Sequence, residues 1–151
     1  MSMWPSLVAR ARLENNPALL CEALPYAGFV GLEAALGTEG RLICRLAYAD
    51  HLIGNPTLPA LHGGVIGALL ESTAILHLLW ETNPEVVPRT INMSFDFLRT
   101  GRPADTFAGG TVTKQGRRVA NVRVEAWQES RDRPIAAAHG HFLLTQVEKN
   151  G

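Results

Sequence analysis

Glu71 is the residue whose surroundings most favour chemistry. It is the only Asp, Glu, Lys or Arg in the 19 residues from His62 to Trp80. Since an unpaired buried charge is costly, a carboxylate in so apolar a segment must be paired, protonated or placed at a cleft. Glu71 could instead simply face solvent, because acids that point into a core are rare. Its neighbours on a helix do not form a solvated surface: they are Gly67, Ala68, Ala74 and Ile75.

His62-Gly63-Gly64 stands where this apolar segment begins, about two helical turns before Glu71. Two glycines let another group approach the backbone closely. If a helix starts here, the N–H groups of its first turn are unpaired, and its dipole favours negative charge. The sequence therefore indicates an oxyanion or phosphate site, although the glycines could also serve only to turn the chain into the helix.

A helix is predicted from His62 to Trp80, ahead of Asn83-Pro84. Its apolar positions follow the 3.6-residue period, with one polar interruption at Ser72, and are residues 65, 68, 69, 72, 76 and 79. A charge at the centre of a membrane span costs about 2.5–3.5 kcal/mol. The flanking charges, Glu81 and Glu85, are also acidic. We therefore expect a buried core helix and no membrane partner.

The segments around this helix contain strand and turn signals. Gly28–Leu36 and Arg41–Ala49 are predicted to form a β-hairpin around Gly37–Gly40. Residues 50–61 hold two prolines and a glycine, which predicts an ordered loop. Beyond Pro88, apolar and polar residues alternate as in a half-buried strand. The later strands are expected at about 90–97, 105–115, 118–129 and 134–146.

Two weaker helices, Pro5–Asn15 and Pro17–Leu24, are predicted before the hairpin. The four later strands are joined by short turns, so we predict an antiparallel meander with one apolar face for the long helix to cover. The expected fold is α+β: a curved antiparallel sheet of about six strands wrapped around one long central helix. We divide the chain into an N-terminal helical segment, residues 1–27, and a main domain, residues 28–147.

The chain has 151 residues, 46% of them hydrophobic, which fits one globular domain. Its 14 basic and 14 acidic residues give no net charge, which disfavours a nucleic-acid partner. Residues 1–88 hold four arginines and eight acids, whereas residues 89–133 hold nine basic and five acidic residues. Arginine outnumbers lysine 12 to 2, which reflects either genomic base composition or phosphate recognition in the basic half.

The cysteines and the N-terminus bear on metal binding and compartment. Cys21 and Cys44 lie in unrelated contexts, so no zinc or other metal site is expected. His139 and His141 are two residues apart on a predicted strand, so both should point to one face, and no cysteine or acid stands beside them to complete a metal site. The histidines predicted to be core or surface residues are His51, His77, His139 and His141. The N-terminus has no apolar core after a basic start, so we expect a cytoplasmic protein without a secretion signal.

Three stretches of the sequence resemble the hotdog-fold thioesterases, in particular the phenylacetate-degradation type that hydrolyses acyl-coenzyme A thioesters. They are NPTLPALHGGVIGALLEST, INMSFDFLRTGRPADTF and VTKQGRRVANVRVEAW. The resemblance covers roughly residues 28–146. The hotdog fold that it implies is a sheet wrapped around a helix, which agrees with the fold expected from periodicity.

The resemblance implies a catalytic role for several residues. Glu71 falls at the position of the catalytic carboxylate, where many members have Asp, and would act as general base or as nucleophile. Gly63 or Gly64 falls where a backbone N–H polarises the thioester carbonyl. His62 and Asn55 match the polar pair that orients the thioester or the water.

Further contributions are implied for the second half of the chain. Thr90 matches a hydroxyl that a neighbouring subunit contributes in some relatives. In relatives, the region that follows the first strand after the long helix and includes the turn at Gly116 lies near the coenzyme A phosphates. The residues in that region here are Arg99, Arg102, Lys114, Gly116, Arg117 and Arg118. Each of them could also be an ordinary residue of a solvated turn.

The function that the resemblance implies is hydrolysis of an acyl-CoA to a free acid and CoA, with no cofactor because CoA is part of the substrate. Two alternatives stay open. One is a hotdog dehydratase or hydratase on acyl thioesters, for which His51 is the available histidine. The other is a non-catalytic acyl-CoA-binding protein. Since a single curved sheet leaves open edges, we expect a homodimer or homotetramer with sites at subunit interfaces.

Overall fold

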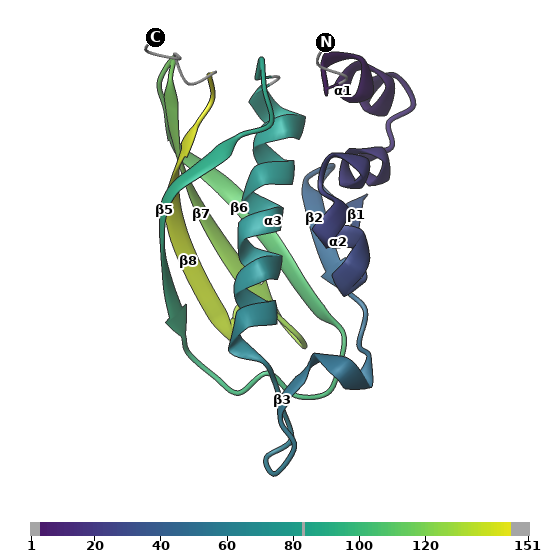
Figure 1. Cartoon of the computed structure of the whole chain (residues 1–151), viewed down its shortest axis with the longest axis vertical. Helices are drawn as coiled ribbons and strands as arrows, with labels where there is room; N and C mark the ends of the chain where they lie inside the picture. Colours follow the sequence, from purple (N-terminus) through teal and green to yellow (C-terminus); the bar gives the residue numbers. More distant parts are fainter. Residues whose placement is uncertain (1–3, 83, 146–151) are drawn as a thin grey trace, which may run out of the picture.

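The longest helix, α3 (Gly63–Thr82), lies along the inner face of a six-stranded antiparallel sheet that curves around it (Figure 1). The structure is a computed structural model and describes residues 4–82 and 84–145. Trp80, at which the predicted helix ends, is followed by two more helical residues. The arrangement confirms the predicted α+β fold, a sheet wrapped around one long helix.

The sheet has the strand order β1-β2-β6-β7-β8-β5, and every neighbouring pair is antiparallel. The strands are β1 (Leu32–Leu36), β2 (Leu42–Leu46), β5 (Arg89–Phe97), β6 (Thr106–Gln115), β7 (Val119–Trp127) and β8 (Ala136–Leu143). The predicted hairpin around Gly37–Gly40 is confirmed, with Gly40 in a left-handed conformation at φ 71°.

The predicted meander of all four later strands is wrong, because β5 pairs with β8 and not with β6. On its other side β6 pairs with β2, from the pair of Leu46 and Thr106 to the pair of Ile43 and Gly109. The connection from β5 to β6, residues 98–105, therefore crosses the end of the sheet. Eight extended residues reach about 26–29 Å, which is ample for three strand spacings of about 5 Å each.

The N-terminal segment packs against β1 of the hairpin and against α3 (Figure 1). It consists of α1 (Trp4–Leu13), a 3₁₀ helix η1 (Pro17–Ala23) and α2 (Pro25–Val30). The predicted strand from Gly28 is wrong over its first residues, because α2 continues to Val30 and ends at Gly31, whose φ is 83°. Arg12 of α1 donates hydrogen bonds to the Leu79 and Trp80 carbonyls at the C-terminus of α3. The division of the chain after residue 27 stays a prediction.

The loop predicted for residues 50–61 has more structure than expected. It contains a 3₁₀ turn, η2 (Asp50–Leu52), and a two-stranded hairpin of β3 (Ile53–Asn55) and β4 (Ala60–Leu61). The Leu61 N–H donates to the Gly101 carbonyl, 2.9 Å away. This bond ties the loop to the connection between β5 and β6, so both lie at the N-terminal end of α3.

Burial on α3 separates a core face from an open face. Four of the six predicted stripe positions are buried, namely Val65, Leu69, Leu76 and Leu79, but Ala68 and Ser72 are only half-buried. The helix is long and apolar enough to cross a membrane, yet 67% of its most apolar stretch is buried inside the protein. The predicted core helix is therefore confirmed.

Truncation of a fully buried side chain on α3 should lower stability strongly. Leu76 is 0% exposed, so Leu76→Ala should lower the free energy of unfolding by about 2–5 kcal/mol in chemical denaturation. Leu13, 88% exposed on α1, provides the control, and Leu13→Ala should change it by less than about 0.5 kcal/mol. Equal effects of the two substitutions would contradict the placement of α3 in the core.

Candidate active site

His62, the residue before α3, fixes the N-terminus of the helix. Its Nδ1 accepts a hydrogen bond of 2.8 Å from the Gly64 N–H. Because Nδ1 is an acceptor, a neutral His62 carries its proton on Nε2. The Gly63 N–H has no hydrogen-bond partner within residues 4–82 and 84–145. The first turn therefore leaves the Gly63 amide free at the positive end of the helix dipole.

The hairpin of β3 and β4 lies against His62. A Cβ atom on Gly54 would come within 2.7 Å of the His62 Cα, so this contact requires glycine. Asn55 follows Gly54, and its Oδ1 accepts hydrogen bonds from the N–H groups of Thr57 and Leu58. The amide NH₂ of Asn55 is left as a donor. The predicted pair of His62 and Asn55 thus lies at one end of α3.

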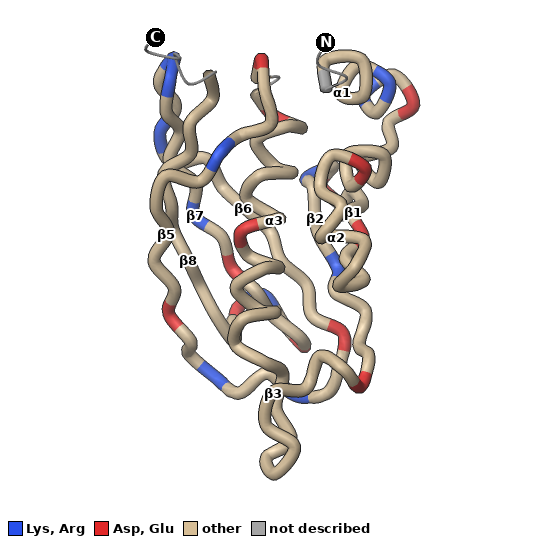
Figure 2. Tube along the Cα trace, in the orientation of Figure 1, with Lys and Arg blue, Asp and Glu red and all other residues tan. Residues whose placement is uncertain are grey.

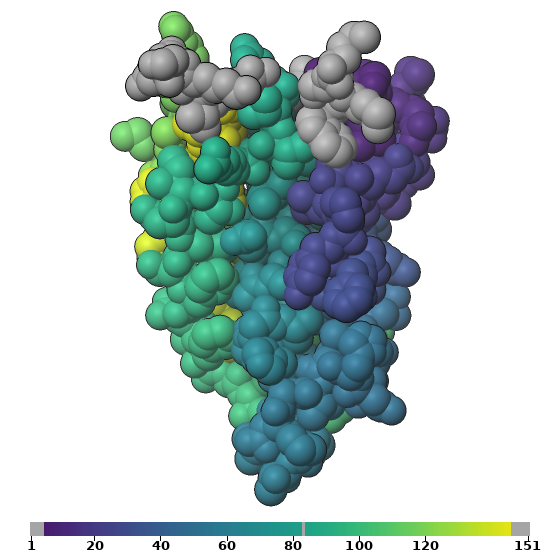
Figure 3. Space-filling model, viewed as in Figure 1, coloured from purple at the N-terminus to yellow at the C-terminus, as the bar shows by residue number. Residues whose placement is uncertain are grey.

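Glu71 lies on the face of α3 that the sheet leaves open. Gly63, Gly67 and Glu71 are four residues apart, so they share one face of the helix. An open depression of about 560 Å³ lies there, lined by Gly63, Gly64, Gly67, Ala68, Glu71, Phe95 and Phe97. Figure 3 shows α3 reaching the surface between β5 and the N-terminal segment. The small residues of the helix make this depression possible, because larger side chains would fill it.

Two phenylalanines of β5 form the other wall of the depression. A Cβ atom on Gly63 would lie 3.6 Å from the Phe97 ring, and one on Gly67 would lie 3.6 Å from the Phe95 ring. Phe95 is 37% exposed and Phe97 is 58% exposed. The sequence predicts a half-buried strand here. In the structure, the two phenylalanines lie on the apolar side of β5 and remain partly exposed.

Of the two placements considered for Glu71, the structure supports the cleft. The side chain is half-buried in the depression, and it has no hydrogen-bond or ion-pair partner in the part of the chain that the structure describes. Glu71 and Gly63 are eight residues apart, or about 12 Å along the helix axis. This separation is too large for one carbonyl group to contact both the Glu71 carboxylate and the Gly63 amide of one subunit.

Thr90 does not join the depression within one chain. It lies at the start of β5, five residues or about 17 Å from Phe95. Thr90 pairs with Phe142 and Asn92 pairs with His141, so Ile91 forms a bulge between them. Because paired residues point to the same face, the bulge turns Thr90 toward the inner face with the buried Phe142.

The predicted phosphate-binding residues separate into two groups at opposite ends of the sheet (Figure 2). Arg99 and Arg102 lie in the connection after β5, at the end where His62 lies. Arg99 donates to the Pro134 carbonyl at 2.9 Å, and Arg102 forms an ion pair with Glu129. A small cavity of about 70 Å³ beside them is also lined by Arg133. The sequence does not single out Arg133, because a charged residue in a turn carries no local sign of its spatial neighbours.

The second group surrounds the turn between β6 and β7. It consists of Lys114, Gly116, Arg117 and Arg118. The turn is closed by a hydrogen bond of 2.9 Å from the Gly116 N–H to the Val119 carbonyl. Since β6 has 10 residues, this turn lies about 30 Å from the N-terminal end of α3. The two groups therefore do not form one basic cluster in a single chain.

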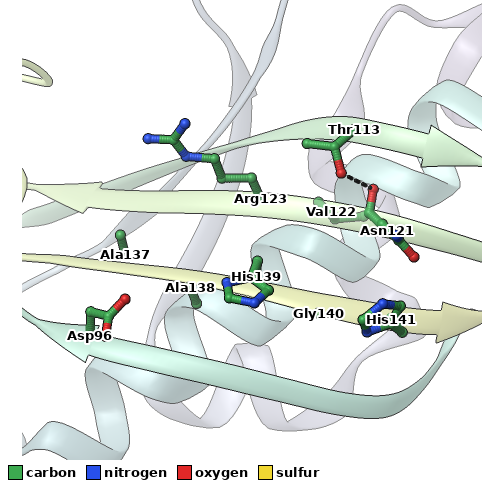
Figure 4. Close-up of a pocket in the computed structure, with 10 residues that line it drawn as sticks. All are labelled: Asp96, Thr113, Asn121, Val122, Arg123, Ala137, Ala138, His139, Gly140 and His141. Carbon is green, nitrogen blue, oxygen red and sulfur yellow. Dashed lines mark hydrogen bonds between the residues drawn. The ribbon is translucent and has the colours of Figure 1, made fainter.

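Two histidines, His139 and His141, lie away from this site. His139 and His141 project from β8 on the outer face of the sheet, beside Asp96 and Arg123 (Figure 4). The Nδ1 atom of His141 is 2.7 Å from Asn92 Oδ1. The prediction that both side chains point to one face is confirmed, and they line a shallow outer pocket of about 390 Å³.

Comparison with known proteins identifies the family. A model of the thioesterase superfamily matches residues 58–135, more than half of the chain. The chain belongs to the thioesterase superfamily. This membership confirms the predicted resemblance. No curated protein sequence matches the chain significantly.

Solved structures of similar proteins share the fold. A protein of Chromobacterium violaceum is 40% identical, with 93% of this chain and 98% of that one covered and a TM-score of 0.74. A protein of Ralstonia eutropha JMP134, described as a candidate thioesterase related to phenylacetic acid degradation, is 22% identical, with 80% and 89% covered and a TM-score of 0.69. A Bacillus halodurans protein solved with CoA is 16% identical, with 96% and 93% covered and a TM-score of 0.73. The last two show a shared fold with this member of the thioesterase superfamily.

The capping role of His62 can be tested by substitution. His62→Ala should lower the free energy of unfolding by about 1 kcal/mol, because the Gly64 N–H loses its acceptor. His62→Asn should retain most of that stability, since asparagine is a good N-cap residue. Chemical denaturation measures both, with His51→Ala at an exposed position as control. Equal losses in the Ala and Asn variants would contradict the capping role.

Proposed function

We propose that the protein hydrolyses acyl-CoA thioesters to a free acid and CoA, in sites formed between two subunits. The proposal rests on one observation: a free Gly63 amide at the N-terminus of α3 lies on the same helix face as the unpaired Glu71 carboxylate. An amide in this position can stabilise the negative charge that develops on a thioester oxygen. Membership of the thioesterase superfamily and the CoA in the Bacillus halodurans relative support the substrate class.

In the proposed mechanism, the thioester oxygen accepts a hydrogen bond from the Gly63 N–H. The His62 Nε2–H and the Asn55 amide orient the thioester or a water molecule. Glu71 either takes a proton from the attacking water or attacks the carbonyl carbon itself. The C–S bond then breaks, CoA leaves as a thiolate and takes up a proton, and one water molecule is consumed. If Glu71 attacks directly, that water hydrolyses an acyl–glutamate anhydride.

The spacing on α3 explains why two subunits are needed. Gly67 lies midway between Gly63 and Glu71, four residues from each. If two α3 helices run antiparallel about a two-fold axis near Gly67, each Glu71 comes beside the Gly63 of the other subunit. The axis therefore creates two identical sites, each with an amide from one helix and a carboxylate from the other.

Strand β5 offers the matching contact in the sheet. It is an edge strand of the sheet, so its outer backbone groups are free to pair with a second copy. Since Phe95 lies against Gly67, an axis through the helix pair near Gly67 also passes near the middle of β5. Pairing of the two β5 strands would cover Phe95 and Phe97, and it carries Thr90 of the second subunit toward the N-terminal end of α3.

The phosphates of CoA are proposed to bind Arg99, Arg102 and Arg133. These side chains lie at the end of the sheet that holds His62, so a thioester at Gly63 places its CoA portion toward them. Guanidinium groups suit phosphate because they donate two parallel hydrogen bonds. Lys114, Arg117 and Arg118 can reach the same CoA molecule only from another subunit.

Removal of the Glu71 carboxylate tests the proposed chemistry. Glu71→Gln and Glu71→Ala should lower kcat/KM for acyl-CoA hydrolysis by about 10²–10⁴-fold, because the base or nucleophile is lost. Glu14→Gln removes an exposed acid on the N-terminal segment and should leave kcat/KM unchanged. A panel of aryl and medium-chain acyl-CoA substrates, with free CoA measured by a thiol reagent, provides the assay.

Three outcomes would contradict hydrolysis at Glu71. Unchanged turnover in both Glu71 variants would remove Glu71 from the mechanism. Acyl-CoA binding by the wild type without release of CoA would indicate a binding protein. Loss of water from a 3-hydroxyacyl-CoA, without release of CoA, would indicate a dehydratase.

The subunit arrangement can be tested separately. Phe97→Asp should shift the protein from dimer to monomer in analytical ultracentrifugation, because the charge replaces an apolar ring at the proposed interface. The monomer should also lose hydrolysis, since Gly63 and Glu71 then no longer meet. Leu13→Asp, at a position 88% exposed on α1, should keep the assembly of the wild type. A fully active monomeric Phe97→Asp variant would exclude a site shared between subunits.

A further inference from the structure

His77 is a polar side chain in the buried part of α3. It is 6% exposed, and its Nδ1 atom has no hydrogen-bond partner in the described structure. A buried polar atom without a partner lowers stability, so such atoms are rare. His77 follows Glu71 by six residues, which places the two side chains on different faces of the helix. His77 therefore has no part in the proposed thioesterase site.

The sheet leaves room beside His77. β2 pairs with β6 only as far as Ile43 and Gly109, whereas β6 continues to Gln115. Beyond that point Gly110 faces the helix, and a Cβ atom on it would lie 3.4 Å from the His77 ring. The result is a cavity of about 350 Å³ between the second half of α3 and the uncovered part of β6, with His77 in its wall.

The other polar residues of this cavity come from three elements. They are Arg41 before β2, Glu81 on α3, and Thr111 and Gln115 on β6. Arg41 and Glu81 carry opposite charges, but the described residues show no ion pair between them. Arg41 lies instead 3.9 Å from Glu39, in a loose and exposed contact. The cavity therefore presents a positive group that has only this loose contact and a negative group that has no ion pair among the described residues.

The ring of His77 adds an uncharged polar group. Burial lowers the pKa of His77 most strongly, Arg41 and Arg131 lower it further, and Glu81 acts in the opposite direction. At neutral pH the imidazole is therefore neutral, and a neutral imidazole can accept a hydrogen bond. A cationic group between Glu81 and His77 would meet a carboxylate and an uncharged ring that does not repel it.

We propose that this cavity is a second binding site, for a small zwitterion of the α-amino acid type. The ligand carboxylate binds the Arg41 guanidinium, and its ammonium group binds Glu81 beside the uncharged His77 ring. Thr111 and Gln115 hydrogen-bond the remaining polar atoms of the ligand. A plain carboxylate or a plain amine would use only one of the two charges and leave the other without a partner. The site does not depend on the proposed hydrolase activity, because it lies on another face of α3.

Binding can be tested on the full chain with the individual L-α-amino acids at millimolar concentration. At least one of them should raise Tm, because a ligand that binds only the folded protein stabilises it. Calorimetric titration of that amino acid should give saturable binding. Its analogue without the amino group and its analogue without the carboxylate should both bind about tenfold more weakly or worse.

Matched variants locate the site. Arg41→Ala and Glu81→Gln should each weaken binding about tenfold or more, whereas Arg123→Ala and Glu14→Gln should leave the affinity unchanged. All four side chains are exposed, so the variants should fold, and circular dichroism without ligand checks this. The proposal is overturned if no amino acid binds, if binding is indifferent to both cavity variants, or if the analogue without the amino group binds as tightly as the amino acid.

Discussion

The sheet curls around α3 without closing, and the free energy of burying this apolar helix is therefore only partly gained within one chain. The sheet ends at β5, so the face with Gly67 and Glu71 is left open. A second copy can cover that face, but only if the side chains on it are small. The glycines of the first two turns meet this condition. This open face reduces the apolar surface that a single chain can bury. It also lets a ligand reach the Glu71 carboxylate and the free Gly63 amide.

His62 connects the loop, the helix and the candidate site. Its N–H donates to the Leu52 carbonyl at 2.9 Å, its backbone touches Gly54, and its ring caps the Gly64 amide. The capping bond selects which amide stays available, because it occupies Gly64 and leaves Gly63. In this way the His62 backbone positions the loop that carries Asn55, and the His62 ring determines which amide a thioester would meet.

The predictable parts of the structure have local signals. The 3.6-residue period of apolar residues predicts α3, and the turn residues Gly37–Gly40 predict the first hairpin. The alternation of apolar and polar residues predicts β5. The position of β5 beside β8 has no local signal, because it depends on β2 occupying the edge of β6. Ala68 fits a core stripe and an open face equally well, so its half-buried placement could not be predicted from periodicity.

Other differences arise where a local signal is ambiguous or missing. Helix α2 has only six residues, and its loosely alternating sequence resembles a strand, although Pro25 and Gly31 mark its two ends. The candidate site is predicted best at Glu71 and His62, where a reactive residue type stands at a distinctive place in the predicted helix. It is predicted least well for the basic residues, since the sequence does not show that Arg133 joins Arg99 or that Lys114 lies at the far end of the sheet.

The strand order has a consequence for the growing chain on the ribosome. α3 and β5 are made before β6, β7 and β8, yet β5 has no neighbour in the sheet until β8 is complete. At about 5–20 residues per second, synthesis from Thr82 to Leu143 takes several seconds. During that interval α3 lacks most of the sheet that covers it and β5 lacks its partner strand, so the incomplete chain exposes more apolar surface than the finished protein.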